Sequence, residues 1–488
     1  VDPRSGEILD ADIGMSDVFA RGARRQVIED FSRPAGHAHE HAPANALSSH
    51  KKLSTCNYMN ESAHELHFAF DLLEARGLDM DSPEAEAVAQ SYVKDVIMHE
   101  VGHTLGFRHN FKASTVYSAK QIQDVEFTKK NGITTSVMDY TPFNIAAKGE
   151  KQPEYGMSTL GAYDYWVVDY AYRQIDAAKE TEELAKIAAR STEPQLIYAT
   201  DEDAGYATMF YGIDPEANRF DLGADPLEYY KKRLKLSREL WDRLEALQLK
   251  PGESYERLTR SFVAGLNQVA RVAPLAAKYV GGVKHLRDRA GSGRALYEPT
   301  SPARQREALK LVADGLLKVD SFKFRPEFVS RIGIDHFERR ANPDVSISAA
   351  VLGTQRQALD VLLADNVAQR LLDSADKVAD PSKAFKLAEL YDTVQNAIWS
   401  ELKAGGDINP LRRNLQREHL RRVVNALVKP APTTPADARA LQRMNAQQLA
   451  AQIKAAMGKA GNKETKAHLA ESLDLLSEAL KASIQRTV

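Results

Sequence analysis

Apolar residues recur at helical spacing over most of the chain. The recurrence predicts helices over five segments: 18–31, 61–76, 83–106, 159–173 and 226–278. From Ser301 onward the apolar period is helical almost throughout, and prolines and threonines at 430–435 mark a break before a last helical pair. Asp81 or Ser82 can cap the helix that begins at Pro83.

Two short segments carry strand signals instead. Residues 9–13 alternate apolar side chains with aspartates, which is the pattern of a half-buried strand. Gly281 and Gly282 lie between Val280 and Val283 and suggest a short hairpin or bulge.

The predicted helix over 83–106 carries the start of an eleven-residue motif. The segment from His99 to His109 reads H-E-x-x-H-x-x-G-x-x-H. His99 and His103 are four residues apart, so both lie on one helix face and can share a metal ion. Gly106 can take the left-handed conformation that ends a helix, and the turn can bring His109 back to that ion. Three histidines with an open fourth position are typical of catalytic zinc, and Glu100 follows the first ligand, where a general base belongs.

A second motif lies downstream, at Ser136-Val137-Met138-Asp139-Tyr140. With the zinc motif before it, the chain resembles the metzincin clan of zinc endopeptidases. The resemblance implies that Met138 forms an apolar floor beneath the metal. It also implies that Tyr140 approaches the zinc and stabilises the oxyanion. Without the zinc motif, a methionine in a turn would be ordinary core.

A narrower group is also similar: large bacterial zinc-dependent metalloproteases of metzincin type, with a long helical region after the catalytic domain. The stretches that carry this resemblance are 1–8, 63–66, 106–111, 136–140, 279–283 and 305–309. It implies an α+β metzincin-like catalytic domain over 1–178 and a mixed, mainly helical connecting region over 179–300. An α-helical C-terminal domain over 301–488 follows. Asn110 departs from the aspartate, glutamate or serine of better-known metzincins, which leaves the subfamily open.

The same resemblance makes residues 9–13 the edge strand above the cleft, along which an extended substrate would pair. The strands and backing helix that usually precede this edge strand are missing, so we expect a catalytic domain without its first strands. A segment of the same precursor is then an expected partner. An extracytoplasmic location, periplasmic or secreted, is implied by the resemblance alone.

Composition narrows the choice of partners. The 488 residues suggest two to four domains, and the net charge of −2 gives no footprint for nucleic acid. No apolar stretch approaches the about 20 residues that cross a bilayer. Cys56 is the only cysteine, so the chain forms no internal disulfide. The expected partner is therefore a peptide or protein substrate.

Two further clusters of potential metal ligands have competing interpretations. Histidines at 37, 39 and 41 suit a second metal site or the rim of the cleft, and a solvated loop is the favoured interpretation. A later acidic stretch is dense enough in oxygen ligands to hold Ca²⁺, but it matches no EF-hand, and a turn-rich solvated linker is favoured. Its members are Asp201, Glu202, Asp203, Asp214, Asp221 and Asp225.

The expected function is that of a zinc-dependent endopeptidase. Zn²⁺ at His99, His103 and His109 would activate a water molecule, and Glu100 would accept its proton and pass it to the leaving amine. One alternative is a catalytically silent peptide-binding or scaffold protein derived from a protease, against which the presence of Glu100 argues. Another is a zinc amidase that acts on a non-protein amide. We also expect Asp164 to bond back to the active-site floor.

Overall fold

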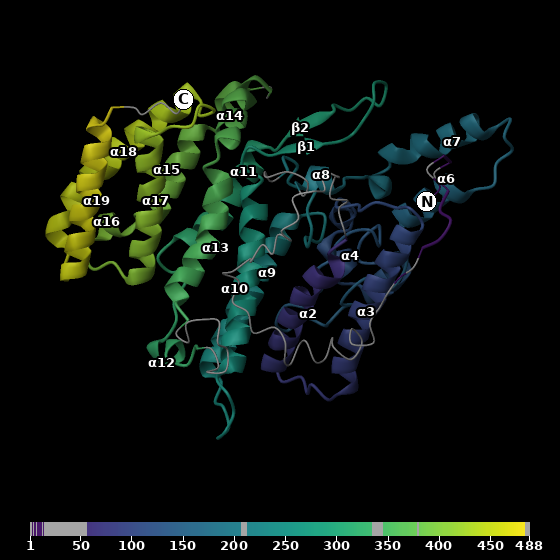
Figure 1. Cartoon of the computed structure of the whole chain (residues 1–488), viewed down its shortest axis with the longest axis horizontal. Helices are drawn as coiled ribbons and strands as arrows, with labels where there is room; N and C mark the ends of the chain where they lie inside the picture. The colour runs from purple at the N-terminus through teal and green to yellow at the C-terminus, as the bar shows by residue number, and fades with distance from the viewer. Residues whose placement is uncertain are drawn as a thin grey trace. The chain divides into compact units, whose positions relative to one another are not determined.

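The computed structural model describes residues 2, 4–5, 7–11, 13, 56–205, 212–333, 345–377 and 380–483. Helices dominate these residues, and the described sheet is one pair of short strands, β1 (Val283–His285) and β2 (Tyr297–Pro299) (Figure 1). The chain divides into two compact units. Unit 1 comprises Val1–Gln268, His285–Glu298 and Arg331–Pro343, and unit 2 comprises Val269–Lys284, Pro299–Ser330 and Asp344–Val488.

Unit 1 holds the helices that carry the zinc motif and those that pack around them. Helix α2 packs against both α3 and α9. The helices are α2 (Tyr58–Ala75), α3 (Pro83–Thr104), α4 (Ala119–Ile122), α5 (Val125–Asn131), α6 (Ala162–Tyr172), α7 (Glu180–Ala188), α8 (Asp201–Ala204), α9 (Pro226–Ala246) and α10 (Glu256–Ala277), which continues into unit 2.

Helix α3 begins and ends where the sequence predicts. The Ser82 hydroxyl accepts a hydrogen bond from the Ala85 amide (3.2 Å), so Ser82 is the N-cap. At the other end the Phe107 amide donates to the carbonyl of Gly102 (3.1 Å), and Gly106 has φ +84°. The Gly106 amide donates to the carbonyl of His103 (2.9 Å), which completes a Schellman motif. This turn reverses the chain just before His109.

Most of the other predicted helices are confirmed. Segment 61–76 lies in α2 except for its last residue, the C-cap Arg76. Segment 159–173 contains α6, and segment 226–278 forms α9 and α10 with a break between them. Residues 430–435 separate α17 from α18. The predicted helix over 18–31 lies outside the described residues.

The strand predicted over 9–13 is wrong for the residues that the structure describes. Residues 7–11 and 13 form no strand, and the Leu9 side chain is 66% exposed. A strand needs a neighbour to complete its hydrogen bonds, and alternation of side chains does not supply one. The predicted boundaries at 178 and 300 stay predictions.

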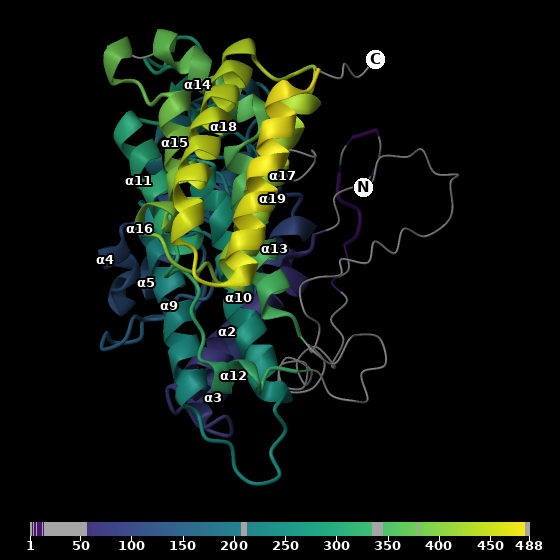
Figure 2. The same ribbon diagram turned by 90° about the vertical axis from the view of Figure 1, so that its left-hand side faces the viewer.

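After β2, the described residues of unit 2 are mainly helical. Helices α17, α18 and α19 pack against one another, and α15 packs against α17 and α18 (Figure 2). The helices are α11 (Pro302–Val312), α12 (Pro326–Val329), α13 (Ile347–Leu362), α14 (Asp365–Asp373), α15 (Leu387–Ile398), α16 (Glu401–Ala404), α17 (Pro410–Val428), α18 (Ala436–Ala456) and α19 (Lys463–Lys481). None of the helices in the described ranges is long and apolar enough to span a membrane.

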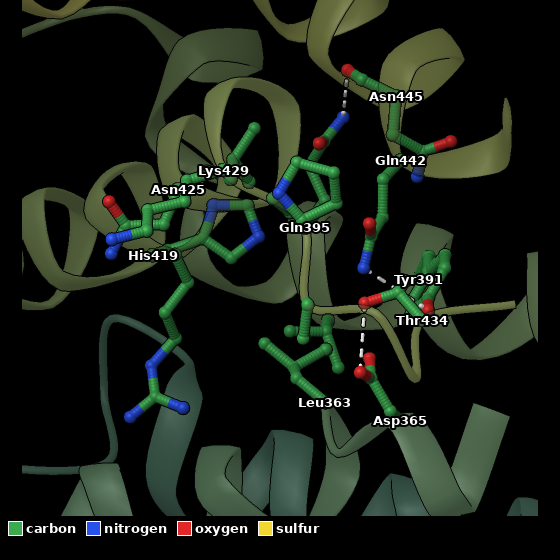
Figure 3. Close-up of a pocket in the computed structure, with 16 residues that line it drawn as sticks. Leu363, Asp365, Tyr391, Gln395, His419, Asn425, Lys429, Thr434, Gln442 and Asn445 are labelled. Carbon is green, nitrogen blue, oxygen red and sulfur yellow. Dashed lines mark hydrogen bonds between the residues drawn. The ribbon is translucent and has the colours of Figure 1, made fainter. Parts of the chain in front are cut away.

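A pocket of about 230 Å³ lies among the helices of unit 2 (Figure 3). His419 lines it, and the ring Nδ1 of this histidine accepts a hydrogen bond from the Trp399 indole (3.2 Å). Burial lowers the pKa of His419 to about 4, so the ring is neutral and can accept. Beside the pocket, the side-chain amides of Gln395 and Gln442 donate to Asn445 and Tyr391 and so link α15 to α18. No metal-binding group of three or more ligands gathers in the described part of this unit.

One buried ion pair joins three helices of unit 1. The Glu65 carboxylate on α2 pairs with the Arg233 guanidinium on α9, and their side chains are 0% and 2% exposed. The Gln268 side-chain amide on α10 donates to the Glu65 carboxylate (2.8 Å). Removing one partner of such a pair leaves the other charge buried, which is costly.

We therefore expect Glu65→Ala to lower the free energy of unfolding of unit 1 by about 3–5 kcal/mol. Urea denaturation followed by circular dichroism measures this change. Lys94→Ala, on the exposed face of α3, is the control and should change it by less than about 0.5 kcal/mol. Equal effects of the two substitutions would contradict the assigned role of the ion pair.

Candidate metal centre

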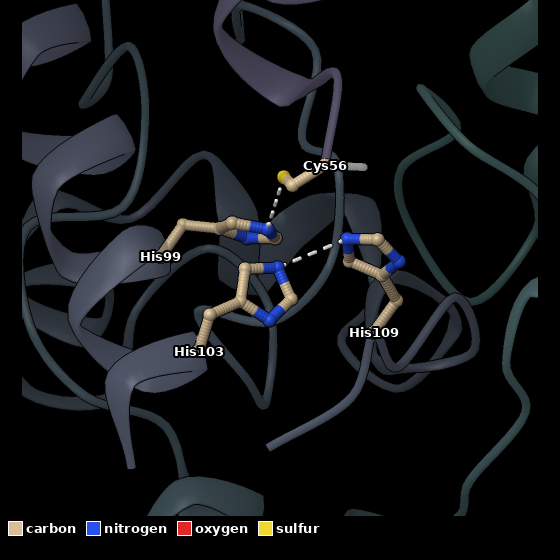
Figure 4. A group of neighbouring side chains, drawn as sticks. All are labelled: Cys56, His99, His103 and His109. Carbon is tan, nitrogen blue, oxygen red and sulfur yellow. Dashed lines mark hydrogen bonds between the residues drawn. The ribbon is translucent and has the colours of Figure 1, made fainter. Parts of the chain in front are cut away.

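The three histidines of the motif meet at one point. His99 and His103 lie one turn apart on α3, and the Schellman turn brings His109 opposite them (Figure 4). The Nε2 atoms of His103 and His109 are 3.1 Å apart. One ligand atom from each histidine and the Sγ of Cys56 all lie within 4.8 Å of one another. In the described ranges this is the group of side chains suited to hold a metal ion.

Every ring is oriented by a hydrogen bond on its outer nitrogen. Because the partner in each case is an oxygen acceptor, Nδ1 carries the hydrogen, and in the neutral ring Nε2 then carries the lone pair that a metal ion would take. His99 Nδ1 donates to the Val137 carbonyl (2.7 Å), and His103 Nδ1 donates to the Phe107 carbonyl (2.8 Å). His109 Nδ1 donates to the Asp201 carboxylate (2.9 Å).

This tautomer pattern fits a metal ion. With Nδ1 protonated and both rings neutral, the Nε2 atoms of His103 and His109 direct lone pairs at each other, an arrangement that a cation between them would stabilise. Tetrahedral zinc with Zn–N bonds of about 2.0–2.1 Å places its nitrogens roughly 3.3 Å apart, close to the 3.1 Å here. Burial, and then the charges of His103 and His109, holds the pKa of His99 well below its usual range, so its ring is neutral.

Glu100 lies beside this cluster and outside it. Its side chain is half-buried, and its Oε1 atom accepts from the thiol of Cys56 at 3.4 Å. Burial raises the pKa of the Cys56 thiol to about 11. A carboxylate that lies next to the metal ligands but is not itself a ligand can accept a proton from a water molecule at the metal.

Tyr140 packs its ring against the histidines. The centroid distances are 5.3 Å to His99 and 4.9 Å to His109. Its hydroxyl accepts a hydrogen bond from the backbone amide of Asn57 (3.0 Å) and lies 3.3 Å from the Sγ of Cys56. Burial raises the pKa of Tyr140, so the hydroxyl keeps its proton and can donate it.

Met138 lies fully buried against the zinc-motif helix. A Cβ added at Gly102 would lie 2.1 Å from the Met138 sulfur, so the thioether packs directly on α3 between His99 and His103. Glycine at 102 permits this close approach. The sulfur therefore gives α3 an apolar support next to the histidines.

Asp164 secures the turn that carries Met138, as the sequence predicts. The Ser136 hydroxyl and the Val137 amide donate to its carboxylate, at 2.7 and 3.0 Å. The Gly161 amide donates to it as well (2.8 Å), so the start of α6 is joined to the turn.

Comparison with known proteins agrees with this geometry. A family model described as Met-zincin matches residues 81–406, more than half of the chain. The chain belongs to the Met-zincin family. This membership confirms the predicted metzincin-clan metalloprotease and implies zinc as the metal. No curated protein and no solved structure matches the chain.

Two residues of this Met-zincin site escaped the sequence analysis. The sequence identified Cys56 only as a thiol without a disulfide partner. This residue lies before the segment that the family model matches. The sequence identified Asp201 only as one of six acidic residues in a possible linker. In the structure its carboxylate orients His109, which lies 92 positions earlier in the chain. The density of acids around Asp201 was the one available signal, and it favoured a different role.

The acidic stretch is not the solvated linker that the sequence favoured. Three of its carboxylates are buried: Asp201, Asp214 and Asp221. Besides the bond to His109, they contact Lys112 (2.6 Å, from Asp214) and Ser114 (2.6 Å, from Asp221). Calcium binding in this stretch stays a prediction. The histidines at 37, 39 and 41 lie outside the described residues.

Asp201→Ala should weaken zinc binding by about 10- to 100-fold, because His109 loses the group that fixes its tautomer and orientation. Competition with a zinc-binding dye measures the affinity. The matched control is Glu202→Ala, which removes the adjacent exposed carboxylate that pairs with Arg108. Equal affinity of the two variants would show that Asp201 does not support the site.

Proposed function

We propose that this Met-zincin is a zinc-dependent endopeptidase. The observation that carries the proposal is the convergence of three histidine Nε2 atoms, each from a ring whose Nδ1 is held by an oxygen acceptor, beside the half-buried carboxylate of Glu100. Membership of the family supports zinc as the metal. His99, His103 and His109 would hold it.

Bound zinc would supply a Lewis acid that activates a water molecule and polarises the substrate carbonyl. Glu100 is placed to take a proton from that water as the oxygen attacks the carbonyl carbon. The protonated Glu100 then gives the proton to the leaving amine, so one carboxylate serves both steps and returns to its starting charge.

Tyr140 stabilises the oxyanion in this proposal. Its hydroxyl keeps its proton, and the Asn57 amide fixes the oxygen next to the histidines. A donor held in place before the reaction stabilises developing negative charge without reorganising. The proposed substrate is a peptide or protein in an extended conformation.

We propose a metzincin α+β layout for the catalytic domain as well. Ile97 and Val101 on α3 and the C-cap residue Leu105 are spaced four apart and are 38%, 42% and 38% exposed. A sheet supplied by a further segment of the precursor would cover this stripe, and a structure of a longer chain would decide the matter. An extracytoplasmic location stays a prediction.

The decisive experiment compares cleavage of an unfolded protein by the zinc-loaded chain and by Glu100→Ala. We expect Glu100→Ala to retain its zinc and to lose turnover by about 10²- to 10⁴-fold, because the general base is gone. Metal analysis of the same samples gives zinc content, and a chelator should abolish cleavage by the parent.

Near-full turnover by Glu100→Ala would show that the water is activated in another way. Cleavage of small amides but of no peptide would favour the amidase alternative. Cleavage of nothing by a parent that binds zinc would favour a silent peptide-binding protein.

Tyr140→Phe should lower kcat by about 10²- to 10³-fold and change KM little, because the hydroxyl acts on the transition state. Steady-state kinetics on a fluorogenic peptide separates the two constants. Tyr165→Phe, which removes an exposed hydroxyl from α6, is the control. A rise in KM at constant kcat would assign the hydroxyl to substrate binding.

A further inference from the structure

The sulfur of Cys56 occupies the place where the reaction has to occur. It lies 3.5 Å from His99 Nε2, 3.4 Å from the Glu100 carboxylate and 3.3 Å from the Tyr140 hydroxyl. These three contacts are with a metal ligand, the proposed base and the proposed oxyanion donor. A water molecule or a substrate carbonyl at the metal would need the same space.

Neighbouring contacts hold the sulfur in this position. Tyr58, two residues later, is 1% exposed; its ring stacks on that of Tyr140 and lies tilted against that of His99, with centroid distances of 4.6 Å each. The Asn57 amide donates to the Tyr140 hydroxyl (3.0 Å). Cys56 is thus the last residue before an anchored segment, and its thiol faces the histidines (Figure 4).

The geometry matches a fourth ligand. Tetrahedral zinc with a Zn–S bond of about 2.3 Å and a Zn–N bond of about 2.0–2.1 Å separates sulfur from nitrogen by roughly 3.6 Å. The distance from Cys56 Sγ to His99 Nε2 is 3.5 Å. Four protein ligands close a zinc site, whereas catalytic sites keep one position open.

We infer that the Cys56 thiolate is the fourth ligand of the zinc ion and holds the resting protein inactive. This inference rests on the proposed function, because it requires the three-histidine zinc site. On closure the thiol gives its proton to Glu100 and then to solvent, and the sulfur lone pair takes the coordination position of a water molecule. No oxidant takes part. Alkylation of the displaced sulfur prevents the closure, and Glu100 and Tyr140 then face an open position.

Cobalt substitution tests the sulfur ligand without relying on activity. A thiolate bound to Co²⁺ gives a near-ultraviolet charge-transfer band, which imidazole ligands do not give. We expect this band in the parent chain and its loss in both Cys56→Ala and Cys56→Ser, with cobalt still bound. Met59→Ala, at an exposed position near the start of α2, keeps the thiol and should keep the band.

Alkylation of the parent chain gives a second test that needs no variant. Iodoacetamide forms a carbon–sulfur bond and releases iodide, and Cys56 is the only cysteine, so intact mass reports on this thiol alone. Zinc should slow the reaction by at least about tenfold, because only the displaced sulfur reacts. Removal of zinc should restore the rate.

Peptide cleavage tests the inhibitory role. Zinc-loaded Cys56→Ala and Cys56→Ser should cleave at least about tenfold faster than the parent, because the closed state no longer forms. A charge-transfer band in the parent without this gain would overturn the inhibitory role. Cobalt binding with no band, together with alkylation that zinc does not slow, would overturn the ligand assignment and leave the three-histidine site standing. Failure of every variant and of the parent to bind cobalt would remove the proposed function and this inference together.

Discussion

The candidate centre depends on one electrostatic constraint: three imidazoles turn their Nε2 atoms toward a shared point. Their outer nitrogens all donate to oxygen acceptors, so in the neutral rings the Nε2 atoms have no hydrogen with which to satisfy one another. An arrangement of this kind is unfavourable in a buried place without a cation. The surrounding contacts make sense as the means of holding it. They include the buried Met138 sulfur against Gly102, the Asp164 carboxylate under the turn and the Asp201 carboxylate behind His109.

These contacts differ in the sequence separation between the residues they join. That separation determined which of them could be predicted from the sequence. The cap at Ser82, the left-handed Gly106 and the spacing of His99 and His103 are local, and each was predicted from neighbouring residues. The link from Asp164 to the turn at Ser136 spans 28 positions and was predicted by resemblance to a known arrangement. Local spacing and a known fold therefore account for most of the candidate centre.

Long-range partners were beyond such arguments. The bond between His109 and Asp201 crosses 92 positions, and the contact between Cys56 and His99 crosses 43. Nothing in the residues around Cys56 or Asp201 states which side chain each will meet, because folding alone brings them together. The strand expected over 9–13 failed for a related reason: its pattern was local, but a strand exists only with a neighbour.

The position of Asp201 also has a consequence for biosynthesis. The chain is made from its N-terminus, so Cys56 and all three histidines are made well before Asp201. A nascent chain can expose every metal-binding side chain while the group that orients His109 has not been translated. The candidate metal centre is therefore complete only after the segment at Asp201 has been made and has docked. During that interval the new polypeptide carries the three histidines and the Cys56 thiol without the carboxylate that orients His109.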